Sequence, residues 1–390
     1  MVEGGFEKQA VPFEMVEFER RLKRVREEMT MRGLQVLMVF KPENYYYLTA
    51  FQGAYYTYVC LIFPLEGEPI FIVPLLEELN VLALTWVKRT ASYSPFSAPP
   101  KNDPVTHTVQ VLKEEGFDQK RIGIELSAWW QTPLQYEQLR KALPSTEFID
   151  VSGLIDGVRA IKSEPELVCI REAGRILTDA MYEGINAVGE GRTENDVASK
   201  ILDRLMLRGS DPAGFWPIIS SGPRTAMPHN VWSGRRFKSG DPVFIEFAGV
   251  VKRYHAPMMR TVAVMTCSKE FREMFDVTCE ALNRGIGVMK AGATSGEVDA
   301  VVRGTIRKAG YGEYFRHRSA YTVGIGFPPS WTGAPSIMEN DPTVLKPGMV
   351  FHMVPVVFRH GMGIGLSESI LVTEKDPEVL ASVERTLFIR

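Results

Sequence analysis

The chain lacks the features that mark membrane proteins, secreted proteins and nucleic-acid-binding proteins. It has no apolar run of about eighteen residues, the length that a membrane-spanning helix requires. Its first residues, MVEGGFEKQAVPF, contain no hydrophobic signal core. Its 45 lysines and arginines are balanced by 47 aspartates and glutamates, and no basic stripe with interleaved aromatics occurs. We therefore expect neither a membrane nor a nucleic acid as a partner.

Cysteine is scarce and scattered along the chain. Its four cysteines are Cys60, Cys169, Cys267 and Cys279, and none forms a CxxC pair. This pattern excludes a zinc knuckle and a disulfide framework, and it is typical of buried thiols in a reducing compartment. We expect a cytoplasmic protein.

A chain of 390 residues is too long for one small core and predicts two domains. In residues 1–157, a helical pattern at Phe18–Arg32 stops at Gly33, and another covers Asp103–Glu115. Short apolar runs typical of buried strands lie at Val36–Phe40, Val59–Phe63, Ile70–Val73 and Ile122–Ile124. The alternation predicts an α/β first domain.

Residues 158–390 show helices first and strands afterwards. Ser163 and Glu166 form a capping-box pattern around Pro165, which predicts the start of a helix over Leu167–Val188. Further helical patterns cover Thr193–Leu207 and Glu270–Lys290. The strand-like runs are Val243–Phe247, Arg260–Met265, Val350–Val357 and Ser369–Val372. This order predicts an α+β second domain.

Glu246 lies in the strand-like run VFIEFAG, close to Phe244 and Phe247. Such a strand is expected to be buried on at least one face. A carboxylate there is costly unless it is paired or has a function. We interpret Glu246 as a general base, or as a nucleophile that attacks an electrophilic carbon. The alternative is a buried ion pair with Arg260 or Arg253.

Aromatic side chains form a second group of candidate site residues, namely Trp232, Trp331, Tyr321, Tyr55 and Tyr56. The faces of Trp and Tyr attract cations, by about 0.5–2 kcal/mol each. Each of these rings can instead serve ordinary core packing. Gathered around a carboxylate, they favour a small cationic or zwitterionic ligand.

Three other polar residues have alternative interpretations. Arg224 is a candidate clamp for a substrate carboxylate, or a surface loop charge. His255, in RYHAP, either lines a pocket or packs in a hairpin, and His352 is interpreted as a satisfied core histidine. Together with Glu246, the two histidines are also candidates for an unusual metal site.

Three segments of the second half resemble the creatinase/prolidase/methionine-aminopeptidase superfamily. They are VFIEFAGVVKRYHAPMMRTVAV (243–264), GMVFHMVP (348–355) and LSESILVT (366–373). The resemblance is strong from residue 160 onward and weak before residue 150. It implies the pita-bread fold, in which the active site lies between curved sheets, preceded by a creatinase-type first domain.

The metallopeptidases of that superfamily hold two metal ions with two Asp, one His and two Glu. The resemblance places Glu246 and Pro257 at the Asp positions, Tyr321 at the His position, and Val354 and Ser367 at the Glu positions. Four of these five residues are poor ligands for a hard dication. We therefore expect no metal and no other cofactor.

The resemblance also implies roles for two further residues. His229 stands where the superfamily carries a catalytic histidine, and imidazole is a natural proton shuttle near neutral pH. A histidine that merely caps a loop is the alternative. Glu368 follows the last ligand position, and we predict that it pairs with a cationic substrate or steers His229. It can equally be an inert partner of Arg260.

Within the superfamily, the sequence most resembles the ectoine-hydrolase branch. The shared segments are IEFAG, RYHAP followed by RTV, HNVW, VGIGFPPSW, VFHMVP and LSE. Those enzymes hydrolyse a ring C–N bond of a cyclic amidine without the usual metal pair. The stretch Thr332-Gly333-Ala334 departs from the acidic residue of that branch, which leaves the substrate open.

The resemblance leaves other functions open. They are a metal-dependent Xaa-Pro peptidase, an enzyme like creatinase or dimethylsulfoniopropionate lyase, and a catalytically inactive binding homologue. Two-domain members of the superfamily form homodimers, so the resemblance implies a homodimer in which Tyr55 and Tyr56 serve the partner's site.

Overall fold

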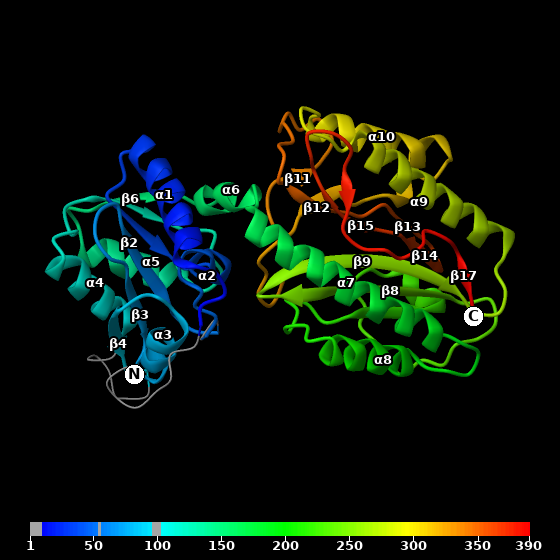
Figure 1. Ribbon diagram of the computed structural model, residues 1–390, viewed down its shortest axis with the longest axis horizontal. Helices are drawn as coiled ribbons and strands as arrows, with labels where there is room; N and C mark the ends of the chain where they lie inside the picture. Colours follow the sequence, from blue (N-terminus) through cyan, green and yellow to red (C-terminus); the bar gives the residue numbers. More distant parts are fainter. Residues whose placement is uncertain (1–9, 54–55, 96–102) are drawn as a thin grey trace. The chain divides into compact units, whose positions relative to one another are not determined.

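The computed structural model describes residues 10–53, 56–95 and 103–390, and the chain folds as two compact units (Figure 1). These units are Met1–Arg159 and Ala160–Arg390. The sequence places the boundary two residues earlier, between residues 157 and 158; both positions fall within helix α6 (Leu154–Ala160). In the described ranges, no helix combines the length and the apolar character needed to cross a membrane.

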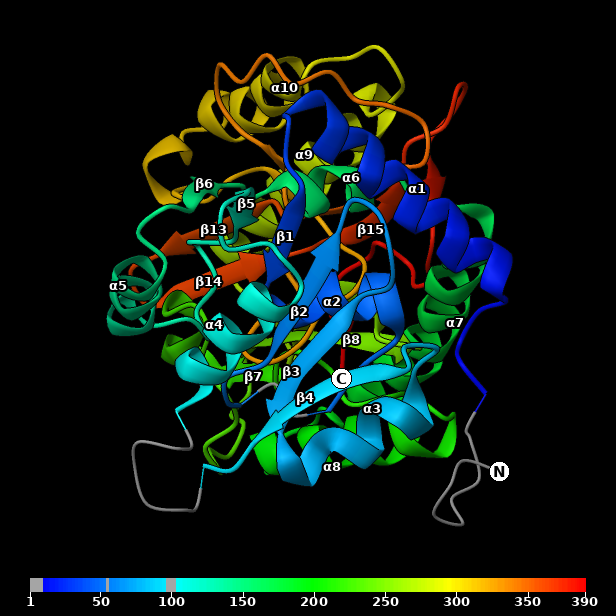
Figure 2. The same ribbon diagram turned by 90° about the vertical axis from the view of Figure 1, so that its left-hand side faces the viewer.

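The first unit is built on a six-stranded mixed sheet with the order β4-β3-β2-β1-β5-β6. In Figure 2 this sheet is turned toward the viewer. The pairs β1–β5, β5–β6 and β3–β4 are parallel, and β2 is antiparallel to β1 and β3. The strands are β1 (Val36–Val39), β2 (Cys60–Pro64), β3 (Ile70–Pro74), β4 (Arg89–Tyr93), β5 (Arg121–Ile124) and β6 (Glu147–Asp150). Besides α6, its helices are α1 (Met15–Met31), α2 (Pro42–Thr49), η1 (Leu75–Glu77), α3 (Glu78–Leu84), α4 (Pro104–Glu114) and α5 (Pro133–Ala142). The α/β prediction for this domain is confirmed.

The second unit contains two larger sheets and a hairpin. The four-stranded sheet has the order β17-β9-β8-β7, and the five-stranded sheet has the order β11-β10-β12-β15-β16. The first sheet comprises β7 (Ile218–Ser221), β8 (Pro242–Val251), β9 (Tyr254–Ala263) and β17 (Phe388–Ile389). The second comprises β10 (Ala320–Thr322), β11 (Ser336–Ile337), β12 (Val350–Met353), β15 (Glu368–Leu371) and β16 (Glu378–Val379). The hairpin is β13 (Val356–Arg359) and β14 (Met362–Gly365).

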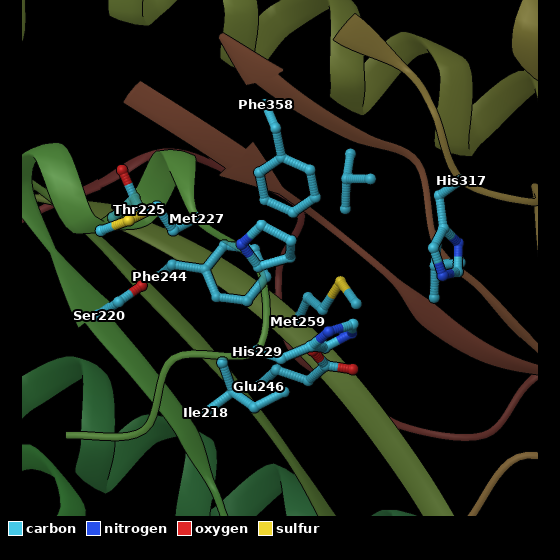
Figure 3. A pocket seen from close by; sticks show the side chains of 13 residues that line it. Ile218, Ser220, Thr225, Met227, His229, Phe244, Glu246, Met259, His317 and Phe358 are labelled. Carbon is cyan, nitrogen blue, oxygen red and sulfur yellow. The ribbon is translucent and has the colours of Figure 1, made fainter. Parts of the chain in front are cut away.

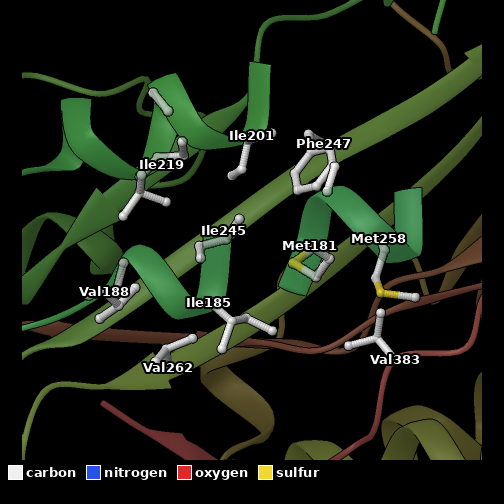
Figure 4. Packing of buried hydrophobic residues seen from close by; sticks show 14 of the residues in the cluster. Met181, Ile185, Val188, Ile201, Ile219, Ile245, Phe247, Met258, Val262 and Val383 are labelled. Atoms are coloured by element: carbon white, nitrogen blue, oxygen red, sulfur yellow. The ribbon is translucent and has the colours of Figure 1, made fainter. Parts of the chain in front are cut away.

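The helices of the second unit are α7 (Glu164–Ala187), α8 (Glu194–Leu207), η2 (Gly222–Ala226), α9 (Lys269–Val288), α10 (Ser295–Lys308) and η3 (Gly312–Tyr314). The predicted capping box starts α7: the Ser163 side chain accepts from the backbone N–H of Glu166, and the Glu166 carboxylate accepts from that of Ser163. These bonds satisfy amide groups that would otherwise lack partners at the helix start. The four-stranded sheet shares one hydrophobic core with helices α7 and α8. In this core, Met181 and Ile185 of α7 lie close to Ile245 and Val262 of the sheet (Figure 4).

The hairpin of β8 and β9 differs from the sequence prediction in length. It closes at Lys252 and Arg253, which both adopt positive φ, and the pairing continues through Ala248 opposite Pro257. A proline inside a strand usually argues against a strand, because it removes one ladder hydrogen bond. This explains why the sequence pattern predicted that the second strand starts only at Arg260.

Candidate active site

A cavity opens inside the second unit, where titratable side chains meet apolar ones (Figure 3). Its titratable lining residues are His229, Glu246 and His317. Apolar lining residues include Ile218, Met227, Phe244, Met259, Val354 and Phe358. The empty volume is about 410 Å³, including open solvent at the mouth of the cavity.

Glu246 projects into this cavity from β8, directly opposite Met259 on β9. It is only 5% exposed, and burial raises the pKa of its carboxyl to about 8. No described residue forms an ion pair or hydrogen bond with this carboxyl. Arg260 pairs with Glu368 instead, and Arg253 donates to backbone carbonyls. The ion-pair alternative is therefore not what the structure shows, and the carboxyl is left available for a ligand.

The raised pKa of Glu246 predicts a pH-dependent stability. The folded carboxyl keeps its proton up to about pH 8, whereas in the unfolded chain it loses the proton near the ordinary pKa of 4.5. The folded state therefore binds more protons within this window, and the free energy of unfolding falls as pH rises through it.

Glu246→Gln removes this titration. Below the pH window between the two pKa values, the variant and the unmodified protein should have the same free energy of unfolding. Above the window, the free energy of unfolding of the variant should be higher by a few kcal/mol, because one pKa unit is about 1.4 kcal/mol. Urea unfolding on both sides of the window measures the difference. The same substitution at exposed Glu280 is the control, and an equal response of both variants would contradict the assignment.

His229 reaches the cavity from the loop that follows η2, and its side chain is exposed. Its backbone is left-handed, with φ of 61°, a conformation that costs a non-glycine residue about 1 kcal/mol. Figure 3 shows the imidazole and the Glu246 carboxyl directed toward the same space. The structure thus brings these two predicted catalytic residues together.

His317 is a cavity residue that the sequence analysis missed. Its Nδ1 lies 2.8 Å from the carbonyl oxygen of Arg318, so this nitrogen must be the donor and carry the proton. Burial lowers the pKa of the ring, which leaves Nε2 unprotonated near neutral pH. The sequence signal that would have indicated a site role for His317 is its position in FRHRSAY, four residues before the candidate site residue Tyr321.

The loop that carries His229 is held by a buried carboxylate, Glu194. This side chain pairs with Arg224 and accepts from the hydroxyls of Ser221 and Ser233. Arg224 also donates to the carbonyl of Val231 at 2.9 Å. The predicted role of Arg224 as a substrate clamp is therefore corrected, because its guanidinium already serves a structural carboxylate.

Glu368 does not line the cavity. Its carboxylate lies 2.6 Å from Nη2 of Arg260, and both side chains are almost fully buried. Arg385 approaches the same carboxylate at 3.5 Å. The structure therefore shows the alternative role, an ion pair between Glu368 and Arg260, and the predicted catalytic role of Glu368 is corrected.

Glu368→Gln tests this correction. It leaves Arg260 as a buried charge without a full counter-charge, and breaking such a pair costs about 3–5 kcal/mol. We expect chemical denaturation to show a loss of this order, with kcat per folded molecule nearly unchanged. A large loss of kcat without a loss of stability would restore the catalytic role.

Two of the predicted substrate-binding aromatics lie together beside the cavity. The indole N–H of Trp331 donates to the hydroxyl of Tyr321 at 3.2 Å, and the Tyr321 ring lies edge-on to that of His317. Trp232 is elsewhere: it packs against the core and, edge-on, against Trp216.

His255 is a satisfied structural residue. Its Nδ1 donates to the carbonyl of Arg253 at 2.8 Å, and its Nε2 accepts from the N–H of Gly214 at 2.8 Å. Burial lowers its pKa to about 3, so the ring stays neutral. This supports hairpin packing rather than the pocket role predicted for it.

The remaining two candidates belong to the first unit. Tyr56 is 72% exposed there. Tyr55 lies outside the described residues.

Comparisons with known proteins agree with this two-unit organisation. Residues 168–374 match the model of Metallopeptidase family M24, and residues 21–161 match that of the Creatinase/Prolidase N-terminal domain. The chain belongs to metallopeptidase family M24. This confirms the family expected from the sequence and identifies a hydrolase fold.

Several relatives of this M24 chain match it over nearly its whole length. The ectoine hydrolase of Halomonas elongata is 31% identical, over 98% of this chain and 99% of its own. The Xaa-Pro dipeptidase of Pyrococcus horikoshii is 30% identical, over 94% and 98%. A solved structure of prolidase from Thermococcus sibiricus has a TM-score of 0.87 at 26% identity, covering 96% of this chain and 99% of that one. The pita-bread fold is thereby confirmed, while the relatives carry names of different activities.

The residues of this M24 chain do not fit the metal pair that the family name implies. Among the ligand positions only Glu246 offers a carboxylate, and in the described parts of the chain no three His, Cys, Asp or Glu are grouped to hold a metal ion. The alternative site of Glu246, His255 and His352 is not formed either, because both nitrogens of each histidine already have protein partners.

Proposed function

We propose that this M24 chain is a metal-independent hydrolase that opens a ring C–N bond in a small zwitterion of the cyclic-amidine class, such as ectoine. The observation that carries the proposal is the Glu246 carboxyl, which is buried without a partner in a cavity shared with His229 and His317. The similarity to an ectoine hydrolase supports the substrate class. The unsuitable donor set at the ligand positions supports a reaction without metals.

The cavity favours a cationic group beside Glu246. A buried neutral carboxyl ionises when a cation comes close, because the opposite charge offsets the cost of burial. An amidinium beside Glu246 would therefore lower the pKa of this carboxyl from about 8 and convert it into a carboxylate. The ring of Tyr321, which lies edge-on to that of the cavity residue His317, adds aromatic surface beside the site.

The reaction then follows from the two cavity residues. Glu246 takes a proton from water while the water oxygen bonds to the amidine carbon. As the bond between that carbon and the ring nitrogen breaks, His229 gives a proton to the nitrogen and takes up the hydroxyl proton that is released when the carbonyl group forms, so protons and charges balance. Direct attack by the Glu246 carboxylate, followed by hydrolysis of the ester-like intermediate, is the alternative route to the same products.

The proposal is tested by offering the purified protein ectoine, hydroxyectoine, creatine and an Xaa-Pro dipeptide. Proton NMR should detect ring opening of ectoine or hydroxyectoine and no cleavage of the dipeptide. Ligands that bind the folded state should also raise its melting temperature. Cleavage of the dipeptide alone would overturn the proposal in favour of a peptidase.

One observation favours that second function. The Xaa-Pro dipeptidase of Pyrococcus horikoshii is nearly as similar, at 30% identity. Against it stand Tyr321, Val354 and Ser367, which cannot provide the imidazole and carboxylate ligands of a metal pair.

A further inference from the structure

A buried chain of hydrogen bonds runs from Trp331 to the backbone of β9. The indole N–H of Trp331 donates to Oη of Tyr321 at 3.2 Å, and Oη lies 2.8 Å from Nδ1 of His352. Nε2 of His352 lies 2.5 Å from Oγ of Ser367, which accepts the N–H of Met259 at 2.6 Å. None of these four side chains is more than 5% exposed.

The chain of hydrogen bonds contains one more polar hydrogen than it has donor–acceptor contacts. Burial holds the pKa of His352 well below its ordinary value, so its ring carries a single N–H. The five hydrogens are those of the Trp331 indole, the Tyr321 hydroxyl, the His352 ring, the Ser367 hydroxyl and the Met259 amide, and they serve four contacts. One hydroxyl hydrogen therefore has no acceptor among these four contacts.

The tautomer of His352 decides which hydroxyl keeps the spare hydrogen. With the proton on Nδ1, the ring donates to Tyr321 and Ser367 donates to Nε2, so the spare hydrogen is that of Tyr321. With the proton on Nε2, Tyr321 donates to Nδ1 and Ser367 accepts twice. The spare hydrogen then belongs to Ser367.

The surroundings favour the spare hydrogen on Tyr321. A buried O–H without an acceptor costs about 1–3 kcal/mol, and both hydroxyls are buried, so the spare hydrogen needs an acceptor outside these four contacts. Burial raises the pKa of the Tyr321 hydroxyl, and this hydroxyl is close enough to the site for Glu246 to raise that pKa further. The Tyr321 ring lies 6.4 Å, edge-on, from that of His317, which lines the cavity. The other end of the chain reaches Met259, directly opposite Glu246.

We propose that His352 and Ser367 are positioning residues that hold the Tyr321 hydroxyl as a hydrogen-bond donor to the substrate. The acceptor is a nitrogen or oxygen lone pair next to the carbon that is attacked. This inference rests on the proposed reaction in the Glu246 cavity. It adds a donor that neither Glu246 nor His229 provides.

The tautomer can be measured without a substrate. In full-length protein labelled with ¹⁵N-histidine, the ¹⁵N shifts of His352 distinguish a protonated Nδ1 from a protonated Nε2. Tyr321→Phe, which removes the partner of Nδ1, identifies the His352 signals. We expect the proton on Nδ1, and a proton on Nε2 would overturn the proposal, because Tyr321 would then donate to His352. If the unmodified protein opens no amidine ring, the proposed function fails, while this measurement still decides the tautomer.

Kinetics test the positioning role. Tyr321→Phe and Ser367→Ala should each lower kcat by about tenfold with little change in KM, the loss expected for one hydrogen bond. Thr278→Val, which deletes a buried hydroxyl in α9 that donates to the Met274 carbonyl, is the matched control.

The double variant separates positioning from a merely structural effect. If Ser367 acts through Tyr321, adding Ser367→Ala to Tyr321→Phe should cause no further loss of kcat. Losses that multiply, or a Ser367→Ala variant with unchanged kcat, would overturn the proposal.

Discussion

Glu246→Gln is expected to lower kcat for ring opening by about 10³-fold, because it removes the general base while keeping the shape of the side chain. The native fold should be retained, since the carboxyl is already uncharged near neutral pH in the absence of a ligand and the variant is expected to be more stable at that pH rather than less. Steady-state kinetics with circular dichroism on the same samples measure both effects.

Glu280→Gln, on the exposed side of α9, is the control for the change of residue type and should keep full activity. A Glu246→Gln variant with kcat within a few-fold of the unmodified protein would contradict the assignment. Mass spectrometry of the protein mixed rapidly with substrate distinguishes the two routes, since only direct attack leaves the substrate attached to Glu246.

His229→Ala should lower kcat by about 10²-fold, since the departing nitrogen would then lack its proton donor. Because His229 is exposed at the cavity, added imidazole should enter the space left by the ring and restore part of the rate. Initial rates measured over a series of imidazole concentrations test this.

His360→Ala is the matched control, because His360 is exposed and lies between β13 and β14, away from the cavity lining. It should show full activity and no response to imidazole. An unimpaired His229→Ala variant would assign proton donation to another group, and His317 would be the first candidate.

Local patterns were sufficient to predict much of the fold. The capping box at Ser163 and the apolar stripe after it specify α7 through contacts within a few residues. Buried strands such as β1, β2 and β3 appear as continuous apolar runs. The start of β9 was missed because Pro257 opposes a strand locally, whereas its ten-residue pairing with β8 overrides that preference.

The site was harder to predict, because its contacts are not local. Glu246 was identified from a carboxylate in an apolar strand, a signal that the sequence carries. Arg260 pairs with a residue 108 positions away. The sequence therefore allowed either Glu246 or Glu368 as its partner, and the structure shows that the partner is Glu368. His317 and Glu246 line the same cavity although they lie far apart in the sequence, and no spacing in the sequence indicates this.

The ligand positions of the family now have a physical interpretation. Tyr321 and Ser367 do not merely leave space, because His352 links them by hydrogen bonds. Val354 adds an apolar wall to the cavity, and Glu246 remains there as a carboxyl without a fixed partner. The central claim is that this carboxyl, rather than a metal pair, activates water.

The most direct test of this claim measures bound metal and ectoine turnover on one sample after exhaustive chelation. The account predicts metal far below one ion per chain, together with the full rate of ring opening and no gain when manganese, cobalt or zinc is added. Loss of turnover on chelation, with recovery on adding one of these metals, would contradict it.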